Sequence, residues 1–153
     1  MKPLLAIDPG ASGGLAWTDA EGITHAEKMP EGMTAQADRL RALAVEHTKL
    51  VAVMEKTGTA RPTDAKPAAA KFARHVGNLE AILYTLGIPT TEVAPGVWQR
   101  FLGEFPKDKP DRKRAIRELM ARRFPALSVT LKTADALGIL TWATERGISR
   151  TVE

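Results

Sequence analysis

Two short apolar runs that each end on an acidic residue constrain the fold of this chain most strongly. The first, PLLAID (3–8), delivers Asp8 into the glycine-rich stretch PGASGG, and the second, LVAVME (50–55), ends on Glu55. Apolar runs of this length, bounded by turn residues, are typical of buried strands. An acid before Pro-Gly is typical of a plain turn, but a carboxylate held at a strand end for chemistry gives the same pattern.

The remaining hydrophobic pattern predicts a mixed α/β protein. We expect further strands at 13–18, 23–29 and 90–94, a short helical segment at 95–103, and helices at 34–47, 68–87, 111–124 and 133–146, the last capped by Thr133. Three leading strands predict an antiparallel meander, and strands separated by helices predict parallel additions to the same sheet. The 153 residues are therefore expected to form one domain (1–153), an α/β fold with a mixed five-stranded sheet flanked by helices.

The composition excludes several classes of protein. The chain has no cysteine, which excludes disulfides and thiolate zinc sites, and its three scattered histidines argue against an imidazole metal cluster. No apolar run approaches the roughly 18 residues that a membrane span needs, and the stretch MKPLLAID lacks the pattern of a signal peptide. We therefore expect a cytoplasmic protein with no membrane partner.

The positive charge is concentrated in one segment. Residues 107–123 (KDKPDRKRAIRELMARR) contain eight basic and three acidic residues, a net charge of +5, whereas the whole chain carries +4. A basic stripe on a near-neutral body is typical of a protein that binds phosphate backbones. A solvated helix face gives the same pattern.

A third acid, Asp135, begins the last predicted helix in KTADALGILTWA. If the strands that end on Asp8 and Glu55 lie side by side, their ends fall together, and the helix can bring Asp135 to the same rim. Taken singly, each acid has an ordinary explanation: a turn former, an exposed strand end, or a complement to the helix dipole. Clustered carboxylates repel one another and need a cation, and oxygen ligands suit Mg²⁺ or Mn²⁺ rather than zinc.

Three motifs in this order, AIDPGASGGLAW, VAVMEK and TADALGILTWA, resemble those of the RuvC-like Holliday junction resolvases of the ribonuclease H-like superfamily. The middle of the chain also resembles their small phage-type members, in HVGNLEAILYTLGIP, EVAPGVWQRFLG and DKPDRKRAIRELMARRFP. The resemblance covers nearly the whole chain. It implies a ribonuclease H-like fold, a homodimer, and Mg²⁺-dependent cutting of four-way or other branched DNA in a bacterium or phage-infected cell. It also implies that Asp8, Glu55 and Asp135 are the metal-binding acids.

One position departs from the family pattern. The family usually carries a further ligand, often an acid, three residues before the last aspartate, and here that residue is Lys132. A lysine cannot bind the metal but can contact the scissile phosphate, so Lys132 is a candidate catalytic residue. Glu80 is an alternative ligand, although a helix-surface position is its more ordinary explanation. If the acids gather, two Mg²⁺ ions would activate water and stabilise the leaving 3′ oxygen, which gives 5′-phosphate and 3′-hydroxyl ends.

The basic residues are candidate DNA contacts, which supply salt-dependent affinity rather than rate. Lys56 directly follows Glu55 and is near enough to hold a phosphate. The other candidates are Arg61, Lys66, Lys71, Arg112, Lys113 and Arg117. The three tryptophans lie in apolar contexts that favour the core, and the helical spacing of Phe72 with Val76 favours the core over insertion into a junction.

Two other functions share parts of this pattern. ATPases and sugar kinases of the actin type also begin with a strand, an aspartate and a glycine turn, but they need two such domains to close on a nucleotide. A non-catalytic DNA-binding module would explain Lys132. We expect no nucleotide cofactor.

The symmetry of the implied substrate predicts a homodimer. A four-way junction is two-fold symmetric, and one domain of this length has room for one acidic cluster. The predicted helix at 68–87 has more apolar width than one sheet face needs, and it is the expected dimer surface.

Overall fold

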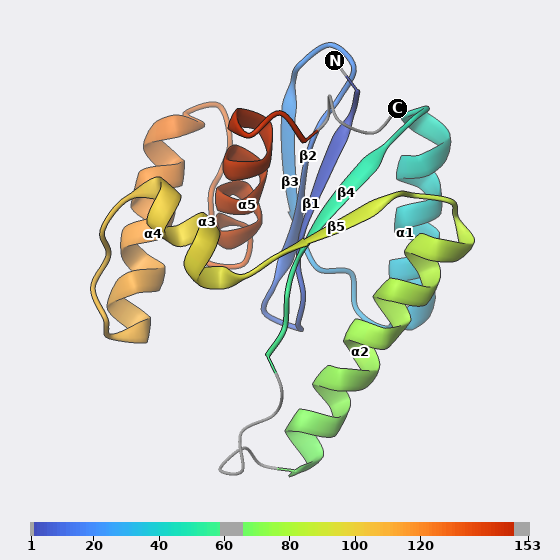
Figure 1. Cartoon of the computed structure of the whole chain (residues 1–153), viewed down its shortest axis with the longest axis horizontal. Coiled ribbons are helices and arrows are strands. Elements are labelled where there is room, and N and C mark those ends of the chain that lie inside the picture. The colour runs from blue at the N-terminus through green and yellow to red at the C-terminus, as the bar shows by residue number, and fades with distance from the viewer. Residues whose placement is uncertain (1, 59–65, 149–153) are drawn as a thin grey trace.

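The computed structural model describes residues 2–58 and 66–148, and within them the chain forms a five-stranded sheet with helices on both faces (Figure 1). The strands are β1 (Leu4–Asp8), β2 (Gly14–Thr18), β3 (Thr24–Lys28), β4 (Val51–Glu55) and β5 (Thr90–Val93). Their order in the sheet is β3-β2-β1-β4-β5. The first three strands pair antiparallel, β4 pairs parallel with β1, and β5 pairs parallel with β4. The predicted arrangement of the sheet is therefore confirmed.

The helices divide between the two faces of the sheet. The first two, α1 (Met33–Glu46) and α2 (Lys66–Thr85), cover one face (Figure 1). On the other face α5 (Ala134–Glu145) lies against the sheet, and α3 (Pro95–Leu102) and α4 (Lys109–Arg123) pack against α5 (Figure 1). Each of the five helices begins and ends within two residues of its predicted bounds. None of the helices in the described residues combines the length and apolar character needed to cross a membrane.

Successive side chains of a strand contribute to two separate hydrophobic cores, one on each face of the sheet. Leu4 and Ala6 of β1 pack on the side of α3, α4 and α5, whereas Leu5 and Ile7 pack on the side of α1 and α2. This follows because successive side chains of a strand point to opposite faces. Eight of the twelve residues of α5 are buried, so this helix is fixed against the sheet along most of its surface.

The hairpin that follows Asp8 is closed against the turn that precedes α5. Asp8 pairs with Gly14 across the β1–β2 hairpin. A side-chain carbon at Gly14 would lie 2.4 Å from the backbone oxygen of Lys132 and 2.8 Å from that of Glu27. These distances are shorter than any real contact, so only glycine allows the approach. The approach brings the residues before α5 to the end of β1, where Asp8 lies.

Two predicted details are wrong. Thr133 stands at the start of α5, but its hydroxyl makes no capping bond to the helix and instead accepts a 3.1 Å hydrogen bond from the backbone N–H of Thr130. Phe72 is 40% exposed rather than in the core. The reason is that the first turns of α2 project past the end of the sheet, where the ring of Phe72 lies beside Gly10 of the β1–β2 turn (Figure 1).

Candidate active site

Asp8 and Glu55 end neighbouring parallel strands and belong to the same face of the sheet. The register of β1 and β4 pairs Ile7 with Met54, so the two acids are the next residues on their strands. Ile7 and Met54 pack on the side of α1 and α2. Because strand side chains alternate between faces, both carboxyl groups lie on the opposite side, which α5 covers.

Asp135 reaches the same place from the first turn of α5. Its side chain is only 13% exposed, and its charge acts on both Asp8 and Glu55, raising the pKa of each. The structure thus brings together the three acids that the sequence singled out. We call Asp8, Glu55 and Asp135 the acidic cluster.

The cation that accompanies the acidic cluster is Lys113 of α4. Its Nζ lies 3.3 Å from Oδ2 of Asp135, and its charge also favours the ionised forms of Asp8 and Glu55 by lowering the pKa of each. One ammonium group therefore compensates part of the negative charge of all three acids. The sequence suggested Lys113 only as a DNA contact.

Burial makes the acidic cluster electrostatically costly. Burial is the main cause that raises the pKa of Asp8 to about 8, and the negative charges of Asp135 and Glu55 raise it further. Burial also raises the pKa of Glu55, although a hydrogen bond from Trp98 opposes this rise. A carboxyl group in this situation gains more from a neighbouring cation than an exposed one does.

The donor set of the acidic cluster suits a hard divalent cation, because Mg²⁺ and Mn²⁺ prefer carboxylate oxygens and because a cation would offset the cost of ionising carboxyl groups that are buried and repel one another. As placed, however, no three acidic or histidine side chains within residues 2–58 and 66–148 converge closely enough to hold one ion. Rotation of the side chains toward a common point is therefore required before Asp8, Glu55 and Asp135 could share a metal.

Trp98 is the site residue that the sequence pattern did not reveal. Its apolar context predicted a core position, and the side chain is indeed fully buried. In addition, its indole N–H donates a 2.7 Å hydrogen bond to Oε2 of Glu55. No local pattern connects α3 with the end of β4, so this contact depends on how α3 packs against the sheet.

The predicted DNA contacts of α2 and α4 differ in their surroundings. Lys66 and Lys71 are exposed on the end of α2 that projects past the sheet, the end at which β4 also finishes (Figure 1). Arg112 donates a 2.8 Å hydrogen bond to a backbone carbonyl in the loop before α4, so it fixes that loop. Arg117 is half-buried on α4, and Arg61 lies outside the described residues.

Lys56 directly follows Glu55, Lys132 stands three residues before Asp135, and both are exposed. The backbone N–H of Lys56, directly after Glu55, donates a 2.7 Å hydrogen bond to the last residue of β5. Lys132 lies in the turn before α5, and its backbone packs against the β1–β2 hairpin. Glu80, the alternative ligand, is exposed on α2 on the other side of the sheet, so it is not part of the cluster.

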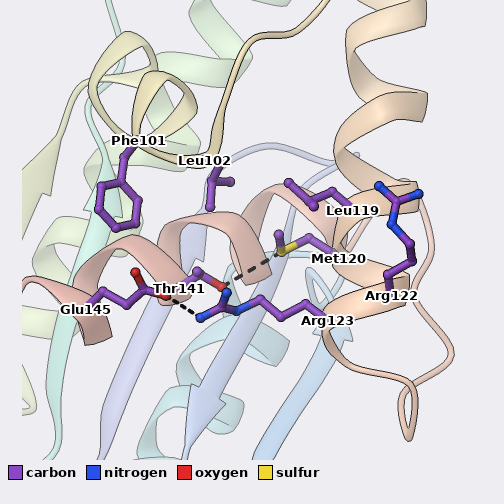
Figure 2. Close-up of a pocket in the computed structure, with 8 residues that line it drawn as sticks. All are labelled: Phe101, Leu102, Leu119, Met120, Arg122, Arg123, Thr141 and Glu145. Atoms are coloured by element: carbon purple, nitrogen blue, oxygen red, sulfur yellow. Dashed lines mark hydrogen bonds and ion pairs between the residues drawn. The ribbon is translucent and has the colours of Figure 1, made fainter.

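A separate hollow lies between α3, α4 and α5 (Figure 2). It has a volume of about 380 Å³, and at its edge Arg123 of α4 pairs with Glu145 of α5. Apolar side chains of α3 and α4, including Phe101 and Leu119, line most of the rest, together with Arg122 of α4 and Thr141 of α5. No member of the acidic cluster lines this hollow, so its role is separate from that of the acids.

Known proteins resemble this chain in structure rather than in sequence. No family model matches the sequence, and no curated protein matches it. The structure of Thermus thermophilus RuvC matches with a TM-score of 0.56 at 17% sequence identity, over 95% of this chain and 96% of RuvC. The chain has the fold of RuvC.

Two further structures share the RuvC-like fold. T. thermophilus RuvC in complex with a Holliday junction substrate matches with a TM-score of 0.55 at 18% identity, over 96% of this chain and 97% of RuvC. Fowlpox virus resolvase in complex with its substrate Holliday junction DNA matches with a TM-score of 0.53 at 10% identity, over 94% of this chain and 99% of the resolvase. The predicted ribonuclease H-like fold is confirmed.

Proposed function

We propose that this protein is a divalent-metal-dependent endonuclease that resolves four-way and other branched DNA junctions by paired nicks. The observation that carries the proposal is the acidic cluster, which gathers carboxyl groups from β1, β4 and α5 and raises the pKa of Asp8 to about 8. Strongly perturbed carboxyl groups at one end of a sheet are typical of a functional site. The RuvC-like fold supports branched DNA as the substrate, since two structures with this fold are complexes with Holliday junction DNA.

In this proposal Asp8, Glu55 and Asp135 hold Mg²⁺, or Mn²⁺ in its place, through carboxylate oxygens. When bound, such an ion supplies Lewis acidity, which polarises a phosphate and makes water a better nucleophile. Lys113 then has two possible partners, Asp135 and the DNA. Once its ammonium group is released from Asp135 by the bound ion, the group can pair with a phosphate oxygen. Lys132 provides a second positive charge at the edge of the cluster.

Exposed basic residues near the acidic cluster supply affinity for the DNA backbone in this proposal. Lys66 and Lys71 on the projecting end of α2 and Lys56 after β4 are exposed at one end of the sheet (Figure 1). Such contacts with phosphates position a duplex without reading its sequence. Arg117, half-buried on α4, is a further proposed contact, and Arg61, outside the described residues, remains a contact predicted from the sequence.

A non-catalytic module that binds branched DNA is the second candidate function. The observation that favours it is the ion pair between Lys113 and Asp135, together with the lack of convergence of the acids in the described residues. In such a module the lysine would permanently replace a metal ion as the counter-charge. An actin-type ATPase gains no support, because the fold is that of RuvC.

Cleavage of a labelled four-way junction tests the proposed function. With Mg²⁺ we expect paired nicks in opposite strands of the junction, and with EDTA we expect binding without cleavage. A linear duplex of the same sequence is the control for branch specificity and should stay intact. Junction binding without cleavage in both Mg²⁺ and Mn²⁺ would replace the nuclease proposal with the non-catalytic module.

A further inference from the structure

The hydrogen bond between Trp98 and Glu55 does more than packing requires. A fully buried tryptophan fills the space between α3, α5 and the sheet through its ring, and a phenylalanine can fill most of the same space. Here the indole N–H also meets Oε2 of Glu55 at 2.7 Å. An indole is a donor only, and a carboxylate has two oxygens, so this bond engages one oxygen and leaves Oε1 for another partner.

The glycine at position 138 of α5 determines where the ring of Trp98 lies. A side-chain carbon at Gly138 would lie 2.6 Å from Cζ3 and 3.1 Å from Cε3 of the indole, which is too close for any real contact. α3 and α5 therefore pack at this distance only because residue 138 has no side chain. Asp135 lies three residues earlier on α5, so one helix both carries an acid of the cluster and supports the ring that contacts Glu55.

We infer that Trp98 is a positioning residue for the metal site: its N–H holds Oε2 of Glu55 and thereby presents Oε1 to the cation. The inference rests on the proposed function, in which Glu55 is a metal ligand. A glutamate has several rotatable bonds, and a ligand that is oriented in advance loses less conformational entropy when it binds. Hydrogen-bond partners of metal ligands commonly change metal affinity by about 10- to 100-fold.

The chain offers a matched pair of variants for this test. Trp98→Phe keeps an aromatic ring and removes the N–H that Glu55 accepts. Trp142→Phe makes the same chemical change on α5, at an indole whose buried N–H has no hydrogen-bond partner in the described part of the chain. A general effect of losing an indole should therefore appear in both variants, whereas a positioning effect should appear only in Trp98→Phe.

The first readout is the Mg²⁺ dependence of junction cleavage. For Trp98→Phe we expect the half-saturating Mg²⁺ concentration to rise about 10-fold or more, with the rate largely recovered at saturating Mg²⁺. Junction affinity in EDTA should equal that of wild type, because the basic surface is unchanged. Trp142→Phe should keep the wild-type Mg²⁺ dependence. Equal Mg²⁺ dependence in both variants would overturn the positioning role while leaving the nuclease proposal intact.

The second readout needs no cleavage and uses the wild-type protein. The three tryptophans give three indole N–H signals in a proton–nitrogen correlation spectrum, which the two variants assign. Paramagnetic Mn²⁺ should broaden the signal of Trp98 first, because its N–H contacts a proposed ligand. Trp142 lies seven residues beyond Asp135, about 10 Å along the helix axis, and should broaden later.

These two readouts separate the positioning role from the proposed function. Early broadening of the Trp98 signal in a protein that cuts no junction would support the positioning role and contradict the nuclease. Broadening of all three indole signals in parallel, or of Trp142 first, would overturn the positioning role. The spectrum also decides the case if Trp98→Phe fails to fold, because Trp17→Phe together with Trp142→Phe then assigns the Trp98 signal by elimination.

Discussion

Asp8 combines a strand-end position with an unfavourable burial of charge. Its side chain is buried at the end of β1, and the folded protein raises its pKa from an ordinary value of 3.8 to about 8. Between these two values the folded protein keeps a proton on Asp8 that the unfolded chain has already lost. The free energy of unfolding of the metal-free protein therefore falls as the pH rises through this range.

We expect Asp8→Asn to melt at a higher temperature than wild type in EDTA, by a margin that grows from about pH 4 to about pH 8 and is constant above it. Asparagine does not titrate, so it lacks the cost of ionising a buried carboxyl group. Thermal unfolding at a series of pH values measures the margin. Asp38→Asn, at an exposed acid of α1, is the control and should show no comparable trend. A margin for Asp8→Asn that is the same at every pH would contradict the burial argument.

The three acids were predictable from the sequence, and two of their partners were not. Asp8 and Glu55 end apolar runs, and the ends of neighbouring parallel strands meet at one edge of a sheet. Asp135 was predictable because it lies in the first turn of the predicted last helix, whose N-terminus can reach the same edge of the sheet. Lys113 and Trp98 contact these acids only through the packing of α4 and α3, which no local periodicity encodes.

The helix α2 is longer than the face of the sheet that it covers. Its buried residues, Val76, Leu79 and Leu83, all lie in its second half. The first half extends past the sheet at the end where β4 finishes (Figure 1), and it exposes Lys66 and Lys71. In the proposed function, this projecting basic end, where the Phe72 ring lies beside Gly10 of the turn after β1, contacts one arm of a branched DNA.

We expect Lys71→Glu to weaken binding to junction and linear duplex alike and to reduce the salt dependence of binding by about one unit of slope. The reason is that a complex with one phosphate contact fewer releases fewer counterions when it forms. A phosphate contact also carries no sequence information, so both DNA forms are affected alike. Lys49→Glu makes the same charge change just before β4, at the other end of that strand from Glu55, and should have little effect. Binding titrations at several salt concentrations measure both. Equal losses in the two variants would show that only net charge matters.

Helix ends were less predictable than helix positions. The sequence placed the start of α4 at residue 111, but the helix starts at Lys109, with the carboxylate of Asp108 accepting a 3.2 Å hydrogen bond from the backbone N–H of Asp111. Hydrophobic periodicity identifies the buried turns of a helix, and it gives no information about exposed first turns. The cap at Asp108 followed by Pro110 was the available signal for the start of the helix.

Residues 2–58 and 66–148 contain one acidic cluster, whereas the proposed reaction requires two matched nicks. A two-fold axis that relates two copies would supply the second cluster. On α2, the small residues Ala69, Ala73, Gly77 and Ala81 recur every four positions, a spacing that places them along one side of a helix and allows close packing. The last three of them are exposed, which supports α2 as the surface between the copies.

We expect sedimentation at micromolar concentration to give twice the chain mass of 16.6 kDa. Because the chain contains no cysteine, single cysteines at Ala73, Gly77 and Ala81 can locate the interface. At least one of them should form an intermolecular disulfide under mild oxidation, and Lys49→Cys should not. A monomer that cuts both strands symmetrically would contradict the dimer, and a dimer without any of these crosslinks would move the interface off α2.

The directions of the strands were predictable because each strand had a recognisable hydrophobic pattern and the connections left few choices. Strands without an intervening helix pair antiparallel, and strands after a helix add parallel. The side of the sheet to which each helix packs was harder to predict from the sequence, and it decides which side chains approach the acids. Phe72 illustrates the difficulty, because its spacing matched a core position whereas its side chain is 40% exposed and lies beside Gly10 of the β1–β2 turn.

The acidic cluster is tested most directly by junction cleavage with Asp8→Asn, Glu55→Gln and Asp135→Asn, each compared with wild type in Mg²⁺. Each change removes one carboxylate and leaves the basic surface intact, so we expect cleavage to fall to background while junction affinity stays equal or becomes tighter. Glu80→Gln, an exposed acid on the other side of the sheet, is the matched control and should cut normally. Normal cutting by any one of the three cluster variants would contradict the assignment of the site.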